Sequence, residues 1–217
     1  MDFSKNPRLD VFKTELVRDA QFTQPFEMPI LKRVDFKPAE GVPFNFAKRS
    51  KNVKQWLHFY IYDYLFERVW NNYNSYLPLF RRFAGVVTPD FSIYREMPLS
   101  MQIWNTYRNR AVAYWLQSKG IDIVPNVRWG DERTYEFAFD GLEKGGTFAI
   151  GTNGCIETKK DRYYFKKGLA KMVEVLEPNA IINYCSKPND IFGVYEERGI
   201  EILTLNYWRD AFRKAAR

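Results

Sequence analysis

Residues 147–205 read TFAIGTNGCIETKKDRYYFKKGLAKMVEVLEPNAIINYCSKPNDIFGVYEERGIEILTL and contain three short apolar runs. These runs, Thr147–Gly151, Ala180–Tyr184 and Glu201–Leu205, have the length and the β-branched content of buried strands. Helical patterns separate them, at Tyr163–Leu176 and Asn189–Arg198. Strands that alternate with helices predict parallel pairing, because a parallel crossover needs a dozen or more residues.

The same alternation extends toward the N-terminus. Two more apolar runs, Phe83–Thr88 and Ile121–Val127, flank a helical pattern at Ser100–Lys119. The connection 128–146 leaves open a strand, TYEFAF, in place of a helix, and a last helix is expected at Tyr207–Ala216. We therefore predict an α/β fold with a mostly parallel sheet of about five strands, open or partial-barrel-like, with flanking helices.

The first fifty residues differ in composition from the rest, because five prolines interrupt any helix or central strand there. We predict an N-terminal extended arm over residues 1–50, packed on the body, with short strand pieces at Ile30–Phe36 and Pro43–Ala47. A single α/β domain then covers residues 51–217. Its first element is predicted to be one long aromatic helix over residues 52–73, which would bury His58.

Composition limits the class of protein. The chain has 217 residues, and 33 Lys and Arg against 26 Asp and Glu give a net charge of +7. Apolar runs are too short to span a bilayer and no secretory signal is readable, so we expect a cytoplasmic protein. One His excludes a His-dependent triad or a multi-His metal site, and two Cys do not support a disulfide scaffold. We expect no metal and no cofactor.

Polar residues follow the predicted strands at their carboxyl ends, where parallel α/β folds bind ligands. Asp90 is the strongest candidate for a chemical role, because it is the carboxylate that comes directly after a strand and could serve as a general base, a nucleophile or an anchor. The residues expected to converge with it are Asn126, Trp129, Thr152, Asn153 and Tyr184. The alternative is that such residues are helix caps and turn formers.

A second group of candidates lies in the segment 104–110, WNTYRNR. Arginine beside aromatic rings suits phosphate binding and base stacking, which makes Asn105, Tyr107, Arg108 and Arg110 candidate ligand-binding residues. An ordinary salt-bridged helix surface is the alternative. The run Gly151–Gly154 suits a tight turn but matches neither the dinucleotide fingerprint nor the P-loop.

Charge and aromatic content together favour nucleic acid as a partner, since basic patches alternate with rings that bases stack on. The leading hypothesis is a protein that binds nucleic acid or a nucleotide at the carboxyl edge of its strands, with a metal-independent glycosyl or phosphoester reaction as one option. The alternative is a non-catalytic interaction protein, for example a phage factor that binds and inhibits a host protein through Phe22, Phe26 and Phe36 of the arm. The oligomeric state is left open.

Residues 86–129, VVTPDFSIYREMPLSMQIWNTYRNRAVAYWLQSKGIDIVPNVRW, resemble a family known as domain of unknown function 4417. The resemblance extends over about residues 50–205. Its specific parts are PDFS-x-Y-x-x-MP, which includes Asp90 and Tyr94, and Asn-x-Tyr-Arg-x-Arg, which begins at Asn105. The family usually has Gly after the Tyr of the later strand, where this chain has Cys185. The resemblance implies a phage or mobile-element setting and supplies no activity.

Overall fold

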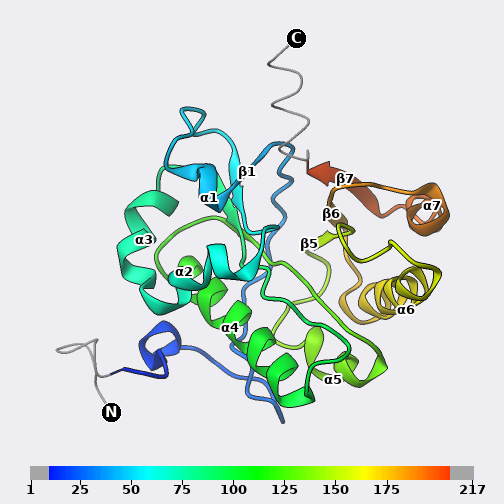
Figure 1. The fold of residues 1–217 in the computed structure, drawn as a ribbon, viewed down its shortest axis with the longest axis horizontal. Coiled ribbons are helices and arrows are strands. Elements are labelled where there is room, and N and C mark those ends of the chain that lie inside the picture. Colours follow the sequence, from blue (N-terminus) through cyan, green and yellow to red (C-terminus); the bar gives the residue numbers. More distant parts are fainter. Residues whose placement is uncertain (1–9, 206–217) are drawn as a thin grey trace.

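The computed structural model describes residues 10–205, which form an α/β fold with two parallel sheets (Figure 1). The first sheet has the order β1-β2-β3-β4, formed by Gly41–Pro43, Trp56–His58, Gly85–Val87 and Ile123–Val124. The second has the order β5-β6-β7, formed by Thr147–Gly151, Ala180–Tyr184 and Glu201–Leu205. Within the described residues every pair of adjacent strands is parallel, as predicted.

A short backbone bridge joins the two sheets. Val127 N–H donates to the carbonyl of Ala149 at 2.8 Å, and Ala149 N–H donates to the carbonyl of Pro125 at 2.8 Å. The seven described strands therefore follow one another in space in the order in which they occur in the chain.

The combined sheet curves until its two outer strands approach each other. A Cβ atom on Gly41 of β1 would lie 3.0 Å from the Leu205 side chain of β7, and Lys37 forms an ion pair with Glu201. No hydrogen-bonded pairing joins β1 to β7 among the described residues, so the sheet is not a closed barrel. Its concave side holds a small apolar core, formed by Tyr60, Val87, Val124, Ala149, Ile182, Tyr184 and Leu205.

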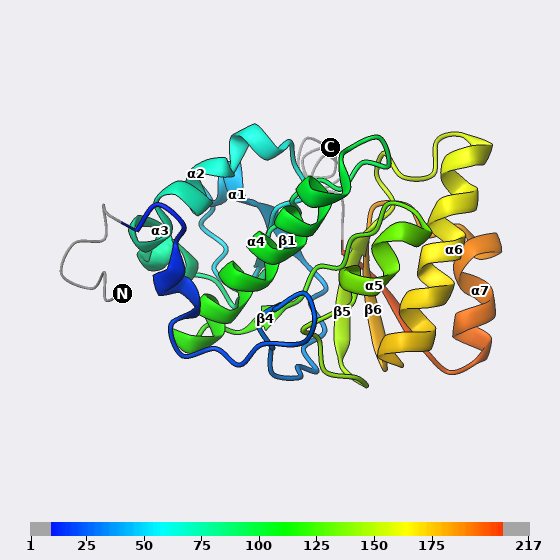
Figure 2. The ribbon, with the colours of Figure 1, turned by 90° about the horizontal axis from the view of Figure 1, so that it is seen from below.

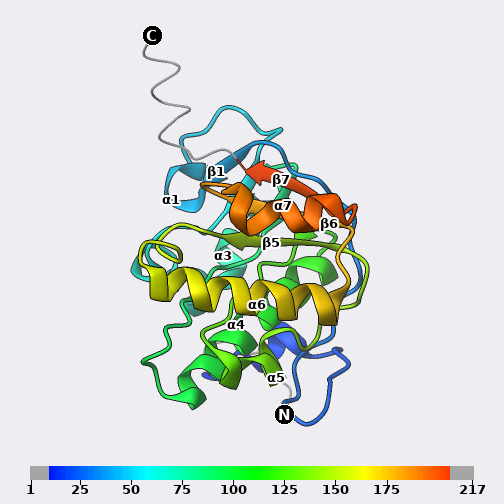
Figure 3. The ribbon, with the colours of Figure 1, turned by 90° about the vertical axis from the view of Figure 1, so that its right-hand side faces the viewer.

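Three long helices cover the convex side. α4 (Leu99–Ser118) packs its buried residues against the first sheet, while α6 (Lys159–Leu176) and α7 (Asn189–Glu197) cover the second (Figures 2 and 3). The shorter helices are α1 (Phe44–Ala47), α2 (Glu67–Asn71), α3 (Tyr73–Phe80) and α5 (Tyr135–Ala138). The 3-10 turns are η2 (Thr14–Val17), η3 (Asp63–Leu65) and η4 (Glu132–Thr134). Among the described residues, no helix is both long and apolar enough to cross a bilayer.

The predicted α/β class and its mostly parallel sheet are confirmed, and the last three strands have the predicted bounds. α6 begins before the predicted residue 163, because Thr158 and Asp161 form a reciprocal capping box at its start. The open question over TYEFAF resolves to a helix, since Tyr135–Ala138 forms α5. The helix expected at 207–216 lies outside the described residues.

The prediction of one helix over residues 52–73 is wrong. This segment contains the central strand β2, then η3, then α2, and His58 lies on the strand. β2 is hydrogen-bonded on both sides, to β1 and β3, and such a strand is a continuous apolar run in the sequence. In a segment so rich in aromatic residues, that run cannot be distinguished from a buried helix by spacing alone.

The predicted arm lies across the body over residues 10–40, where it buries Leu16, Met28 and Leu31. The strand piece expected at Ile30–Phe36 is reduced to a single bridge between Leu31 and Leu142. At the predicted Pro43–Ala47 strand, the chain instead ends β1 and forms α1. Residues 41–43 thus belong to the first sheet.

Cys185 adopts a backbone φ of 82° directly after β6, in the left-handed region that favours glycine. We predict that Cys185→Gly raises the free energy of unfolding by about 0.5–1 kcal/mol, because relief of this strain exceeds the entropy that glycine loses on folding. Urea denaturation measures the change. Cys185→Ala is the control, since it keeps a Cβ atom at positive φ, and a glycine variant no more stable than the alanine variant contradicts the prediction.

His58 is fully buried, and burial lowers its pKa to about 3. The unfolded chain, with a His pKa near 6.5, therefore binds more protons than the folded chain between these two values. The contribution of His58 to the free energy of unfolding is therefore complete above pH 6.5. It decreases as the pH falls toward 3, by about 1.4 kcal/mol per pH unit within that window.

We predict that His58→Phe removes most of the loss of stability between pH 6.5 and 5. His58 is the one histidine of the chain, so no other imidazole titrates in this range. Urea denaturation at several pH values measures the slope. An unchanged slope in the variant would show that another group is responsible.

Candidate functional site

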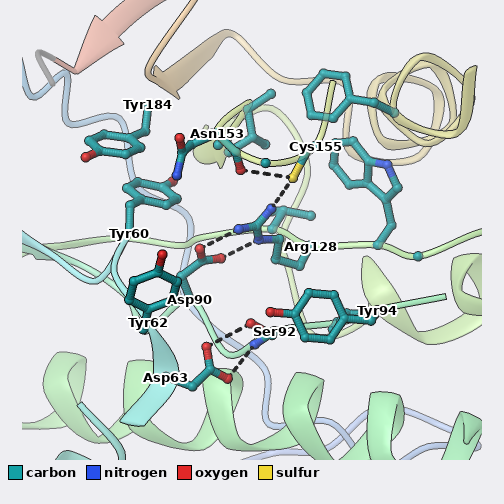
Figure 4. Close-up of a pocket in the computed structure, with 18 of the residues that line it drawn as sticks. Tyr60, Tyr62, Asp63, Asp90, Ser92, Tyr94, Arg128, Asn153, Cys155 and Tyr184 are labelled. Carbon is teal, nitrogen blue, oxygen red and sulfur yellow. Dashed lines mark hydrogen bonds and ion pairs between the residues drawn. The ribbon is translucent and has the colours of Figure 1, made fainter. Parts of the chain in front are cut away.

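A cavity of about 440 Å³ opens at the carboxyl ends of the strands (Figure 4). Residues after β2, β3, β4 and β5, together with the end of β6, form its wall, so the cavity spans both sheets. The polar and aromatic groups that these strand ends contribute include Tyr60, Asp90, Arg128, Asn153, Cys155 and Tyr184. The predicted convergence of strand ends at this edge is what the structure shows.

A bidentate ion pair crosses the floor of this cavity. Arg128 Nε lies 2.5 Å from Asp90 Oδ1, and Arg128 Nη2 lies 2.6 Å from Asp90 Oδ2. Asn126 Nδ2 donates a third hydrogen bond to Asp90 Oδ1 at 2.8 Å. Burial by itself lowers the pKa of Arg128, but the negative charge of Asp90 raises it well above its ordinary value. Asp90 therefore receives three donors while only 5% of its surface is exposed.

Hydrogen bonds extend this pair to the neighbouring strands. Tyr60 Oη donates to Asn126 Oδ1 at 2.9 Å, and its ring stacks on Tyr184 with centroids 4.5 Å apart. Burial raises the pKa of Tyr60 well above its ordinary value, so the phenol stays protonated and acts as a donor. On the other side, Arg128 Nη1 lies 2.8 Å from Cys155 Sγ. One polar network thus connects the strand ends of both sheets.

A second carboxyl group lies on the adjoining wall. Asp63, from η3, accepts hydrogen bonds from Ser92 N–H at 3.0 Å and from the Ser92 hydroxyl at 2.8 Å. Burial raises the pKa of Asp63 above its ordinary value, although these two donors act to lower it. Tyr94 lies on the same wall (Figure 4).

An ion pair between the loop after β3 and the start of α6 forms another part of the cavity wall. Arg95 Nη2 lies 2.7 Å from Asp161 Oδ1, and the Arg95 guanidinium lies 4.7 Å from the centre of the Tyr164 ring. Hydrogen bonds from Thr158 and Arg95 lower the pKa of Asp161 to about 2. The loop that carries Tyr94 is therefore fastened to α6.

Aromatic faces and acceptor oxygens dominate the lining. The aromatic residues are Tyr60, Tyr62, Tyr94, Trp129, Tyr164, Phe165 and Tyr184. Trp129 fits against α6 because position 168 is glycine, where a Cβ atom would lie 2.1 Å from the indole ring. The two arginines of the described lining, Arg95 and Arg128, are both paired with carboxylates. The cavity can therefore stack a flat ring and accept hydrogen bonds from it.

Five of the residues predicted from the sequence line the cavity: Asp90, Tyr94, Trp129, Asn153 and Tyr184. Two more support it from behind. Asn126 positions Asp90, and the Thr152 hydroxyl lies 2.7 Å from the carbonyl of Ser186 and 3.1 Å from that of Tyr184.

The four candidates on α4 do not line the cavity. Arg108 donates to both oxygens of Glu67 and to Asn105 Oδ1, while Asn105 itself donates to the carbonyl of Ser92. Tyr107 stacks beside Trp104 with centroids 5.6 Å apart. In the structure the Nη atoms of Arg108 thus bind protein acceptors, and this segment lies away from the cavity.

The guanidinium of Arg110 also donates its hydrogen bonds to protein acceptors. It is 1% exposed and donates to the carbonyls of Ala138 at 2.7 Å and Asp140 at 2.9 Å, and to Asn109 Oδ1 at 2.6 Å. Burial lowers its pKa to about 10, which still leaves it charged at neutral pH. Arg110 thus fixes the chain around α5 against α4.

Several residues of the lining were not candidates from the sequence, among them Asp63, Arg128 and Cys155. Asp63 lies in the segment that was predicted to be helix, so its position at a strand end was hidden. Arg128 and Cys155 follow β4 and β5 as the other candidates do. Their place after a predicted strand was the signal that could have identified them.

Comparisons with known proteins show which family the chain matches. The model of the family described as Domain of unknown function (DUF4417) matches residues 20–206, which confirms the resemblance. The Gene 1 protein of Mycobacterium phage L5 is 35% identical over 164 residues, covering 73% of this chain and 71% of that protein. The Gene 1 protein of Mycobacterium phage D29 is 34% identical over 163 residues, covering 73% of this chain and 60% of that protein. This chain thus spans less than two thirds of the D29 protein. No solved structure matches.

We predict that Asp90→Asn lowers the free energy of unfolding by about 3 kcal/mol, because it leaves the Arg128 charge without its partner in a largely buried position. Arg128→Met is expected to lower the free energy of unfolding by a comparable amount, because it leaves the charge of Asp90 without its partner. The double variant should lose clearly less than the sum of the two, since neither charge is then left alone. Urea denaturation of all four proteins measures this coupling, and additive losses would show that the pair is not coupled.

Proposed function

The chain belongs to the domain of unknown function 4417 family, and from that premise we propose that it is a phage-type protein that binds nucleic acid or a nucleotide. The nucleobase occupies the cavity at the carboxyl edge of the strands. The observation that carries the proposal is the lining, in which aromatic rings surround a floor of hydrogen-bonding oxygens. A volume of about 440 Å³ lies within the range of small-molecule sites.

The charges of the lining favour a base over a phosphate. Asp90 and Asp161 are paired with Arg128 and Arg95, and Asp63 and Glu96 leave the lining with an excess of negative charge. A phosphate in the cavity would be repelled by these carboxylates. A base carries N–H donors that match carboxylate and amide oxygens, and its flat ring stacks on tyrosine or tryptophan.

In this proposal, the net charge of +7 attracts the phosphates of the ligand to the surface outside the cavity. A protein with this excess of Lys and Arg attracts polyanions and raises their rate of encounter. In the proposal, the surface of the protein carries the phosphates and the cavity holds the neutral part of the same ligand.

We assign Asp90 the anchoring role among those considered for it. Both of its oxygens already accept hydrogen bonds, from Asn126 and from the guanidinium of Arg128. Asp63 is a second carboxyl group of the lining, and burial raises its pKa above the ordinary value.

The arm does not favour the alternative of a host-protein inhibitor. Phe26 packs against Phe137 with ring centroids 5.7 Å apart, and Phe36 packs against Trp56 at 5.5 Å. Of the three aromatic residues considered for such an interface, these two contact the body of the protein, while Phe36 keeps 38% and Phe22 41% of its surface exposed.

Protection of a thiol tests the cavity directly. The chain has two cysteines, so Cys185→Gly leaves Cys155 as a single thiol in the cavity wall. We predict that nucleosides and nucleotides slow alkylation of Cys155 by iodoacetamide at least about tenfold at saturation, because a base in the cavity covers the sulfur. Mass spectrometry measures the rate.

Ribose 5-phosphate is the matched control ligand and should not protect, since it has no base. Alkylation in urea should be fast with every ligand, which shows that the ligands do not quench the reagent. The proposal fails if no nucleoside or nucleotide protects at millimolar concentration, or if ribose 5-phosphate protects equally.

A further inference from the structure

Two exposed tyrosines lie together at the mouth of the cavity. Tyr62 is 74% exposed and Tyr64 is 75% exposed, and their rings stack with centroids 6.0 Å apart and an angle of 13° between the planes. Neither ring is buried in the core of the protein. Tyr62 lines the cavity, whereas Tyr64 lies outside the set of lining residues.

The turn between these residues is held rigidly. Asp63 is bound by both the N–H and the hydroxyl of Ser92, and this contact fixes η3 against the loop after β3. Figure 4 shows Tyr62 and Asp63 on the same side of the cavity as Asp90. The stacked pair is therefore a fixed continuation of the cavity wall into solvent.

An arginine without a carboxylate partner lies on the same segment. Arg68 is exposed and its guanidinium lies 5.1 Å from the centre of the Phe44 ring, next in the chain to Asn45 of the cavity lining. Within the described part of the chain, no carboxylate lies within ion-pair distance of Arg68, in contrast to the two arginines inside the cavity. Its donors are thus available to a ligand.

We propose that Tyr62, Tyr64 and Arg68 form a platform for single-stranded nucleic acid that continues from the cavity. The base next to the one in the cavity stacks on Tyr64, and Arg68 contacts a backbone phosphate. This inference rests on the proposed function and specifies its substrate class, which is a strand and not a free nucleotide. Arg68 follows Tyr64 by four residues in the chain, and exposed aromatic faces combined with positive charge are the elements with which proteins hold single strands without reading their sequence.

Charge supports this occupant over a protein partner. The chain as a whole has a net charge of +7, which attracts a phosphate backbone, and Arg68 supplies a charge on the segment that carries the two tyrosines. A duplex would keep its bases stacked inside and would offer no free base to Tyr64. The platform therefore fits single strands in particular.

The test compares a nucleoside with a labelled single-stranded hexanucleotide, measured by fluorescence anisotropy over a salt series. Tyr64→Ala should weaken hexanucleotide binding about tenfold and leave the salt slope unchanged, since stacking on one base is lost. Nucleoside protection of Cys155 should not change in this variant, because Tyr64 does not line the cavity. Arg68→Gln should lower the salt slope by about one, as expected for the loss of one phosphate contact.

Phe12→Ala is the matched control, because Phe12 is equally exposed, at 75%, and belongs to the arm. It should bind the hexanucleotide as the unmodified protein does. If Tyr64→Ala binds normally, or if a duplex of the same length is weakened equally, the platform is wrong while the cavity proposal stands. If neither the nucleoside nor the hexanucleotide binds to the unmodified protein, both proposals fail.

Discussion

The ion pair between Asp90 and Arg128 is the interaction on which the candidate site depends. It joins residues 38 positions apart, brings the loops after β3 and β4 together, and supplies the surface on which Asn126, Tyr60 and Cys155 are arranged. A charge that is largely removed from water is stable only when its partner and its hydrogen bonds are complete. Loss of either charge would therefore disturb the floor of the cavity and the contact between the two sheets at once.

Side chains of helix α4 support the loops that carry the ion pair. Asn109 holds the carbonyl of Pro89, Asn105 holds that of Ser92, and Arg110 holds those of Ala138 and Asp140. Two residues of the Asn-x-Tyr-Arg-x-Arg motif, Asn105 and Arg110, thus fix loop carbonyls from behind, while Arg108 binds Glu67. Guanidinium groups suit this use, because they offer several donors in a rigid plane and stay charged when buried. A motif that resembles a ligand-binding segment in the sequence has, in the structure, its donors directed inward.

The second sheet could be predicted from the sequence, and the first could be predicted only in part. Strands β5, β6 and β7 are five-residue apolar runs with clear helices between them, so pattern and length agree. Strands β1 and β2 have three residues each, too few for a period to appear, and the aromatic residues after Trp56 have nearly helical spacing. For the site, the carboxyl edge was predictable because parallel strands direct their loops to one edge. Which side chains face the cavity was not, since the pairing of Arg108 with Glu67 and of Arg128 with Asp90 depends on contacts between distant segments.

The bridge at Asn126 and Ala149 has a mechanical consequence. The first sheet contributes Asp90 and Arg128 to the cavity and the second contributes Asn153 and Tyr184, yet few backbone hydrogen bonds join the two sheets there. On the opposite side, β1 and β7 meet through a glycine, a leucine and an ion pair, with no ladder between them in the described residues. Elsewhere the arm joins the second sheet by backbone, since Thr147 N–H donates to the carbonyl of Val34 at 2.7 Å. The side-chain contacts from Asp90 through Arg128 to Cys155 are therefore a further link between the two sheets, placed at the strand ends where the cavity lies.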